Sequence, residues 1–344
     1  MKRIAIEEHF HTQRYVNHLR SRTDYPKVEI SRDRQNNEIE LLWCAPGYYL
    51  PRKPEITNRL LDMADMRLQE MDETGIDMQI LSLVCPGPEI FDAPTGTTLA
   101  RQTNDELFEV IKRHPKRFAG FAALAPQDPR SAADELERAV KQLGFKGAKI
   151  NSHIRGEYLD DQKYWVMLER AETLGVPIYI HPREPSSDML KPYLTYPALA
   201  GSMWGYAAET GLHAMRLICS GVFDKYPNLK IILGHLGEAL PFWLWRLDQR
   251  WNVGEGASDP LVKRLMKKPS QYVKDNFLVT TSGMFWEPAF LCVYLSLGAD
   301  NILFAVDYPF EASKEAVQFM DGLSICDHDK EKIYHLNAEA LLGL

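Results

Sequence analysis

The sequence predicts an α/β fold, a (β/α)8 TIM barrel with a long insertion in its first βα loop. Two observations predict it: short β-branched or apolar runs recur eight times, and longer segments with helical spacing separate them. Eight alternations of strand and helix along one chain indicate a closed parallel sheet. The expected strands span residues 3–8, 78–84, 117–124, 145–152, 177–181, 230–234, 277–282 and 301–306.

Amphipathic helices are expected between these strands. Apolar residues recur at positions i, i+3, i+4 and i+7 in segments 56–74, 98–114, 131–143, 163–174, 211–225 and 239–251. Glycines at positions 75, 175 and 298 come just before the second, fifth and eighth strands. A glycine there is typical of a helix end, because it adopts the left-handed conformation that terminates helices.

Two stretches fall outside this alternation. Residues 14–54 are polar and irregular, and they separate the first strand from the first helix. Because βα loops of a barrel project over its catalytic face, we expect a lid or substrate loop there and not a separate domain. Residues 182–205, rich in proline and aromatic residues, form the second stretch. With no linker or repeat in sight, residues 1–344 are expected to form a single domain.

Composition narrows the range of partners. The 344 residues include 40 Lys and Arg against 47 Asp and Glu, a net charge of −7, which argues against a nucleic-acid surface. No apolar run approaches the roughly 20 residues of a membrane helix, and the N-terminus does not resemble a signal peptide. The five cysteines are scattered, as is typical of reduced thiols. We therefore expect a cytoplasmic protein that acts on small molecules.

Candidate metal ligands lie at the predicted strand ends. Glu7 and His9 are two residues apart on a strand, so their side chains leave the same face at the barrel mouth. His181 ends the fifth strand and Asp307 follows the eighth, and carboxyl ends of barrel strands converge. A lone histidine at a strand end is more often a hydrogen-bonded core residue. Together, four nitrogen and oxygen ligands favour one Zn²⁺, Mn²⁺ or Fe²⁺ ion.

His235 and Glu238 allow two interpretations. Glu238 fits a first-turn residue that is favoured by the helix dipole, with His235 as an ordinary satisfied polar group. Alternatively, Glu238 orients His235 for acid–base or electrostatic work near pH 7. The position of His235 after the sixth strand favours the second interpretation.

Two arginines are candidates for binding a substrate carboxylate, because the guanidinium fork gives bidentate contact. Arg52 lies at the end of the long insertion, and Arg216 lies on the expected helix 211–225. A solvated surface charge is nevertheless the commoner role of an arbitrary arginine.

These motifs resemble the amidohydrolase superfamily, in particular its aminocarboxymuconate-semialdehyde decarboxylase-like branch. That branch includes γ-resorcylate, 2,3-dihydroxybenzoate and 5-carboxyvanillate decarboxylases. The similarity runs through residues 4–10, 144–153, 179–182, 223–227, 234–238 and 307–310. Within the branch, Arg52 and Arg216 resemble the arginines of the carboxyvanillate type, whereas residues 7–10 and Phe310 are similar to the resorcylate type.

The resemblance implies a distorted barrel with one Mn²⁺ or Zn²⁺ ion held by Glu7, His9, His181 and Asp307. It also implies that His235, supported by Glu238, lies beside the substrate. We expect the protein to be a homo-oligomer, a dimer or a tetramer.

The implied reaction is the non-oxidative decarboxylation of a hydroxylated aromatic acid. Direct loss of carbon dioxide would leave an unstabilised carbanion, so the ring carbon must first be protonated. Asp307 is the expected proton donor, and His235 is its partner in the pocket. The metal would hold the phenolate and carboxylate oxygens.

A mononuclear hydrolase or hydratase acting on a lactone or a ring-cleavage product is the alternative. A binuclear centre is not expected. Two-metal relatives use a carboxylated lysine at the end of strand four, whereas Lys149 lies deeper in that strand.

Overall fold

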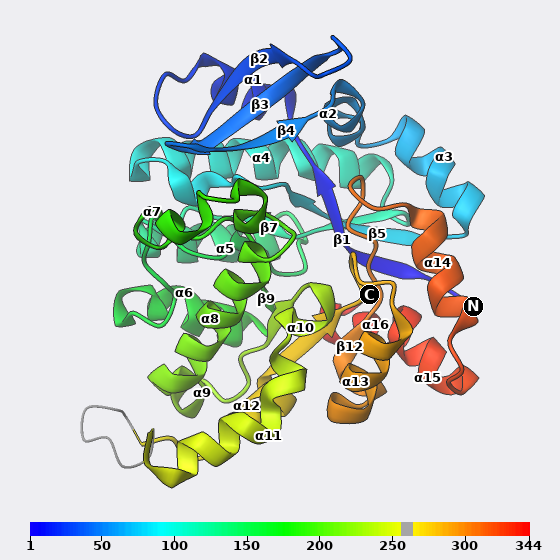
Figure 1. Cartoon of the computed structure of the whole chain (residues 1–344). Helices are drawn as coiled ribbons and strands as arrows, with labels where there is room; N and C mark the ends of the chain where they lie inside the picture. The colour runs from blue at the N-terminus through cyan, green and yellow to red at the C-terminus, as the bar shows by residue number, and fades with distance from the viewer. Residues whose placement is uncertain (256–263) are drawn as a thin grey trace.

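A ring of short parallel strands forms the centre of the molecule, and helices surround it (Figure 1). The computed structural model describes residues 1–255 and 264–344. In ring order the strands are β1 (Ile4–Phe10), β5 (Met78–Leu83), β6 (Phe118–Gly120) with β7 (Ala122–Ala123), β8 (Ala148–Asn151), β9 (Ile178–His181), β10 (Ile231–Leu233), β11 (Phe277–Thr280) and β12 (Ile302–Leu303). The eight predicted strand positions are therefore all present, and the barrel prediction is confirmed.

The barrel is distorted at two places. The third strand changes partner between β6 and β7: the amide of Phe121 donates to β5, and the next amide, of Ala122, donates to Gly147. The eighth strand is shorter than predicted, since only Ile302–Leu303 has strand geometry. The chain after it still closes the ring, because the amide of Asp307 donates to the carbonyl of Glu7 at 3.0 Å and the amide of His9 donates to that of Tyr308 at 2.8 Å.

A bulge in β1 turns the candidate ligands towards the barrel interior. Ile6 belongs to the apolar cluster that includes Tyr179, and the next residue, Glu7, accepts a hydrogen bond from the hydroxyl of the same Tyr179. Two successive residues can face one side because the register between β1 and β5 shifts between Ala5 and Glu8. The bulge thus places carboxylate and imidazole groups above an apolar floor.

Sixteen α-helices lie in the part of the chain that the structure describes, and most cover the outside of the ring. They are α1 (Gln13–Ser21), α2 (Pro54–Leu61), α3 (Asp65–Thr74), α4 (Ala93–Arg113), α5 (Pro129–Lys141), α6 (Trp165–Leu174), α7 (Ser187–Leu190), α8 (Gly205–Ser220), α9 (Val222–Lys225), α10 (His235–Glu238), α11 (Leu240–Arg250), α12 (Pro269–Asn276), α13 (Glu287–Leu297), α14 (Ser313–Gly322), α15 (Asp327–Glu331) and α16 (Asn337–Leu342). One apolar cluster has members from Ala5 to Tyr334, and the single domain stays a prediction.

Two of the predicted helices are interrupted. The expected helix 56–74 is wrong as one element, because Asp62 accepts hydrogen bonds from the amides of Ala64 and Met66, both at 2.9 Å, and so ends α2 before α3 begins. The expected helix 211–225 ends early at Gly221, which has a φ of 71°, and α9 follows separately.

The long insertion has regular structure, so its expected irregularity is wrong. Helix α1 is followed by an antiparallel sheet of β2 (Lys27–Arg32), β3 (Glu38–Ala45) and β4 (Tyr48–Arg52). The sheet lies beyond the end of β1, at the top of Figure 1. Most side chains of β2 and β3 are exposed or half-buried, so these strands lack the continuous apolar runs by which the barrel strands are predicted.

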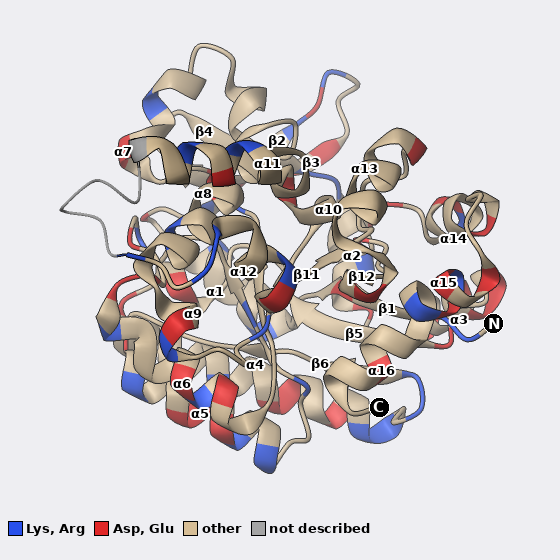
Figure 2. Cartoon of the chain, turned by 90° about the horizontal axis from the view of Figure 1, so that it is seen from below, with Lys and Arg blue, Asp and Glu red and all other residues tan. Residues whose placement is uncertain are grey.

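The surface carries charges of both signs. Basic and acidic segments are interspersed over α5, α6 and α15 in Figure 2 and are not gathered by sign. Among the described residues, no helix combines the length and the apolar character needed to cross a membrane.

Candidate metal centre and active site

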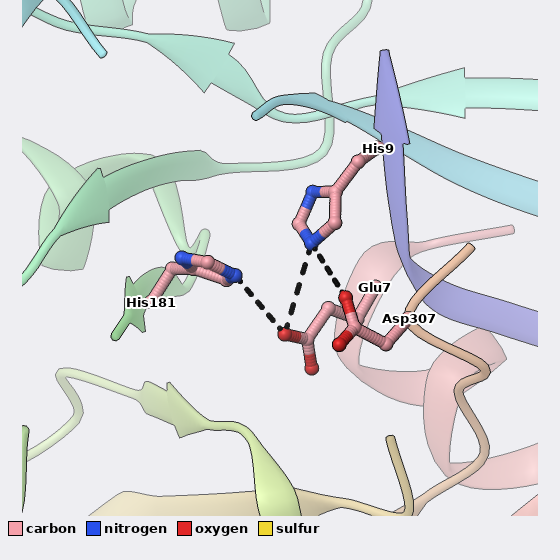
Figure 3. Close-up of side chains that lie close together, drawn as sticks. All are labelled: Glu7, His9, His181 and Asp307. Atoms are coloured by element: carbon pink, nitrogen blue, oxygen red, sulfur yellow. Dashed lines mark ion pairs between the residues drawn. The ribbon is translucent and has the colours of Figure 1, made fainter. Parts of the chain in front are cut away.

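The four predicted metal ligands meet at the barrel mouth (Figure 3). Glu7, His9, His181 and Asp307 each offer one ligand atom, and these atoms lie within 4.8 Å of one another. The Nε2 atom of His9 is 2.9 Å from Oδ1 of Asp307, and Nε2 of His181 is 3.4 Å from Oε1 of Glu7. This convergence of three strand ends is the arrangement that the sequence predicts.

These residues fit a divalent cation. Glu7 Oε1, His9 Nε2 and Asp307 Oδ1 are buried close to one another, yet none of the three makes a hydrogen bond of good geometry within the described chain. A buried polar atom without a partner is costly, and a cation between these three atoms would satisfy them all. Burial, with a further contribution from Lys149, lowers the pKa of both His9 and His181, so their imidazoles are neutral and can bind a metal. The site can therefore hold one metal ion.

Three hydroxyl groups hold the other oxygen of Glu7. Tyr179, Ser282 and Thr280 all donate to Oε2, the last at 3.1 Å, which leaves Oε1 facing the other ligands. Such outer partners orient a ligand carboxylate. Sequence reasoning did not assign Tyr179 or Thr280 to the site. The only available signal was that both are polar side chains within predicted strands.

Two buried basic side chains contact His9 at atoms other than Nε2. Lys149 Nζ lies 3.2 Å from Nδ1 of His9 and donates to the carbonyl of Leu83 at 2.7 Å. Burial lowers the pKa of Lys149 to about 8. Arg67, which is fully buried, donates to the backbone carbonyl of His9, and its guanidinium lies 4.2 Å from the ring of Tyr308. Nothing in the helical pattern around Arg67 indicated this role.

His235 and Glu238 form the predicted pair, with Nδ1 of His235 2.8 Å from Oε1 of Glu238. The five residues from His235 to Ala239 all have positive φ angles, between 50° and 83°, so the short element α10 is a left-handed turn and not a regular right-handed helix. Four of them are not glycine, so this segment is strained, and such strain gathers at functional sites. Burial lowers the pKa of His235, but Glu238 and Glu7 outweigh burial and raise it well above its ordinary value.

Asp307 connects this pair to the ligand cluster. It has a φ of 78°, and its Oδ2 lies 3.8 Å from Nε2 of His235 while Oδ1 faces His9. Burial acts to raise the pKa of Asp307, but interactions with His235 and His9 outweigh it and lower the pKa to about 2. Asp307 is therefore a carboxylate in the substrate-free protein, as metal binding requires.

The two candidate arginines differ in their surroundings. Arg52, at the end of β4, has Nη1 3.1 Å from Nε2 of His11, a residue that follows β1 directly. Arg216 instead makes a bidentate pair with Asp160, with both contacts at 2.9 Å, and its side chain is 45% exposed. The structure therefore brings Arg52 to the barrel mouth but does not bring Arg216 there. The role of Arg216 in substrate binding stays a prediction.

A cavity of about 670 Å³ adjoins the cluster. Asp307, His235 and Glu238 line one end of it. A cavity beside a metal site and groups with shifted pKa values is typical of an active site.

Comparison with known proteins places this geometry in a family. The amidohydrolase family model matches residues 9–344. A γ-resorcylate decarboxylase of Polaromonas sp. (strain JS666) is 39% identical over 99% of this chain and 98% of its own. The crystal structure of 5-carboxyvanillate decarboxylase from Sphingomonas paucimobilis has a TM-score of 0.89 at 38% identity and covers 100% of this chain and 99% of its own.

A dihydroxybenzoic acid decarboxylase from Polaromonas sp. JS666, solved with bound manganese and the inhibitor 2-nitroresorcinol, has a TM-score of 0.84 at 38% identity. It covers 100% of this chain and 97% of its own. Both the matched length and the identity exceed what a shared fold alone would give. The chain therefore belongs to the amidohydrolase family.

Proposed function

We propose that this protein catalyses the metal-dependent, non-oxidative decarboxylation of a hydroxylated aromatic carboxylic acid. The convergence of Glu7, His9, His181 and Asp307 beside His235 carries the proposal. The similarity of nearly the whole chain to decarboxylases of such acids supports it. Mn²⁺ is the metal we propose, because a relative of this kind was solved with bound manganese. Glu7, His9, His181 and Asp307 would hold the ion, which would supply positive charge to stabilise the phenolate and carboxylate oxygens of the substrate.

In the proposed reaction, Asp307 carries the proton. The incoming phenol gives its proton to the Asp307 carboxylate, and Asp307 then delivers this proton to the ring carbon that bears the carboxylate. The bond between that carbon and the carboxylate breaks, its electron pair returns to the ring, and carbon dioxide leaves. The phenolate product takes up a proton from water. Nε2 of His235 lies 3.8 Å from Oδ2 of Asp307. The imidazole can therefore stabilise Asp307 both as a carboxylate and as a carboxylic acid.

Arg52 is the proposed partner of the substrate carboxylate. Its guanidinium lies at the barrel mouth, bonded only to His11 and, at 3.4 Å, to the carbonyl of Cys85 among the contacts of the described chain. A charged fork with spare donors can bind a carboxylate bidentately. Arg216 would have to leave Asp160 before it could do the same.

Isotope labelling tests the reaction. A panel of ortho-hydroxybenzoates is assayed by ultraviolet change with the manganese-loaded protein. In heavy water the phenolic product should carry one deuterium at the carbon that lost its carboxylate, and excess bicarbonate should drive the reverse reaction. Incorporation of labelled water oxygen, with no carbon dioxide released from any acid, would overturn the proposal and favour the hydrolase or hydratase alternative.

We also infer that the protein is a homo-oligomer whose copies meet at an aromatic patch. The patch consists of Met203, Trp204, Phe242, Trp245 and Trp286, which are each 62–74% exposed. Three of them line the mouth of the same cavity, and Trp245 is one helical turn from Phe242. At roughly 150–250 Å² per side chain, the patch approaches the ~800 Å² that each partner buries in a standard interface.

A second copy of the chain is the occupant that this patch fits. Exposed apolar area of this size is unusual on a monomer. Light scattering should give a multiple of 39.4 kDa for the wild type, and Trp245→Glu should lower the mass towards one chain, whereas Leu295→Glu, at an exposed site elsewhere, should not. A wild type that stays at 39.4 kDa at every concentration would contradict the inference.

A cytoplasmic location is part of the same proposal. All five cysteines are free thiols, which a reducing compartment maintains. Fractionation of cells that express the chain would test it.

A further inference from the structure

The cavity beside Asp307 has two chemically different ends. Asp307, His235 and Glu238 form the polar end. Most of the remaining wall is apolar, with Leu236 and Val293 buried at 3% and 4% exposure, although Glu311 also lines it. We call this second end the apolar lobe and define it by Leu236, Phe242, Met284, Trp286, Ala289 and Val293.

The whole cavity is larger than the ring of a simple hydroxybenzoate requires. A cavity of about 150 Å³ suffices for benzene, whereas this cavity measures about 670 Å³. A ring held against the ligand cluster through its carboxylate and phenol oxygens would fill only the polar end. Its other positions would then point towards the apolar lobe.

The charges around the cavity discourage a second anionic group there. Among the described residues that line it, none is a lysine or an arginine, and its one histidine, His235, lies at the polar end and is already paired with Glu238. Glu311 and Asp307 are both acidic. A carboxylate in the lobe would lose its hydration without gaining a cationic partner. An apolar group in the lobe would instead gain by leaving water.

We propose that the apolar lobe is a subsite for an uncharged alkyl or aryl substituent on the ring of the substrate. The inference rests on the proposed decarboxylase function, and it names the substrate class as aromatic monoacids with an apolar ring substituent. The lobe opens at Met203, Phe242 and Trp286 of the aromatic patch, so a second copy seated there would cover its mouth.

A substituent series tests the subsite. The series is 2,6-dihydroxybenzoate with hydrogen, methyl, ethyl or propyl at carbon 3 or at carbon 4, together with the matching carboxylate-substituted acids. In one of the two positions kcat/KM should rise by up to about fourfold per added CH₂. The carboxylate in that position should lower kcat/KM at least tenfold. The inference is overturned if neither alkyl series gains, or if the diacid is used as well as the propyl compound.

Paired variants on α13 test whether the gain in kcat/KM with an alkyl substituent arises in the apolar lobe. Ala289→Phe fills the lobe, so the ratio of kcat/KM for the propyl acid to that for the parent should fall to one or below. Leu295→Phe, on the same helix but 81% exposed, should keep the wild-type ratio. If Ala289→Phe does not fold, Trp286→Ala, at a side chain 65% exposed, removes one wall and should lower the same ratio at least threefold. An unchanged ratio in the folded wall variants would contradict the subsite.

Binding of product phenols tests the subsite independently of the decarboxylation reaction. By calorimetry with manganese-loaded protein, 4-propylresorcinol or 5-propylresorcinol should bind at least tenfold more tightly than resorcinol. Equal affinities would overturn the subsite even if decarboxylation is observed. Tighter binding without any carbon dioxide release would support the subsite and contradict the proposed reaction.

Discussion

The imidazole of His235 and the carboxylate of Glu238 meet at 2.8 Å across a segment in which every residue has left-handed backbone geometry. In a regular helix, residues three apart lie on one face, but these two are joined by a tight strained turn. The turn keeps Glu238 5% exposed beneath His235, whose Nε2 remains directed at Asp307. Glu238 is therefore positioned to orient His235 through the Nδ1 atom of its imidazole.

Removal of this carboxylate should affect the reaction more than metal binding. Glu238→Gln is expected to lower kcat by roughly 10- to 100-fold, the usual effect of losing an outer partner of a site residue. The metal content should stay near wild type, because Glu238 is not among the four ligands. Glu287→Gln, at an exposed acid that begins α13, is the matched control. An unchanged kcat in Glu238→Gln would show that His235 does not depend on this partner.

The pairing of His235 with Glu238 could be predicted from sequence spacing, but its geometry could not. Leu236, Glu238 and Ala239 are not residues that favour a positive φ, so nothing in their identities indicates the left-handed turn. A tertiary contact helps to hold the turn, since the amide of His235 donates to the hydroxyl of Ser282 at 3.1 Å. For the same reason, the buried partners Lys149 and Arg67 escaped prediction, since only the tertiary fold brings them to His9.

The prediction that Glu7 and His9 share one face of the first strand was right, although the strand contains a bulge that the sequence did not reveal. Strict alternation places Glu7 and His9 on one face, and the structure agrees. The same alternation would send Ile6 to the opposite face, yet the bulge lets Ile6 join the interior cluster. Sequence periodicity identifies which residues share a face, but it does not reveal where a strand gains an extra residue.

One divalent metal per chain is expected at the Glu7 cluster. Elemental analysis of freshly purified active protein should find close to one equivalent, and chelation should abolish activity that Mn²⁺ then restores. Glu7→Gln should lose most of the metal, because Oε1 is the shared neighbour of both histidines. Glu311→Gln, in the same cavity but outside the cluster, should keep it. Full activity after exhaustive chelation would contradict a metal-dependent reaction.

Substitution of the two candidate arginines by leucine should affect kcat/KM to different extents. Arg52→Leu is expected to lower kcat/KM by about 10- to 100-fold, since a lost charged bidentate contact costs roughly 1.5–3 kcal/mol. The sequence alone predicts a similar loss for Arg216→Leu. The exposed pair of Arg216 with Asp160 instead leads us to expect less than a threefold change in kcat/KM and at most about 1 kcal/mol in the free energy of unfolding. A large decrease of kcat/KM in Arg216→Leu would instead support the predicted role of Arg216 in binding the substrate carboxylate.

Acid should destabilise the fold partly through His213. This residue is fully buried on α8, and its Nε2 accepts a hydrogen bond from the amide of Leu159 at 3.1 Å. Burial, with Arg216 nearby, lowers the pKa of His213 from 6.5 to about 3. The unfolded chain then binds a proton below pH 6.5 that the folded protein does not bind until about pH 3. Stability from this group is therefore complete above pH 6.5 and is lost as pH falls towards 3.

Denaturant unfolding at two pH values measures this contribution. Between pH 7.5 and 5.5, His213 should account for a loss on the order of 1 kcal/mol in the free energy of unfolding. His213→Gln, whose amide oxygen can still accept from Leu159, should lose correspondingly less over the same interval. His328→Gln, at a side chain that is 67% exposed, should behave like the wild type. Identical pH dependence in His213→Gln and the wild type would contradict the assignment.

Asp307→Asn separates the two duties proposed for Asp307. The amide oxygen can still occupy the position of Oδ1 beside His9, so we expect a folded protein that retains part of its metal. The amide cannot accept the phenol proton or deliver it to carbon, so turnover should fall by at least 10³-fold with every acid of the panel. Binding of resorcinol should weaken far less than turnover, because the ligand atoms of Glu7, His9 and His181 remain in place. If Asp307→Asn still places deuterium on the product carbon at a rate near that of the wild type, another group supplies the proton, and His235, the neighbour of Asp307 in the cavity, becomes the donor to test next.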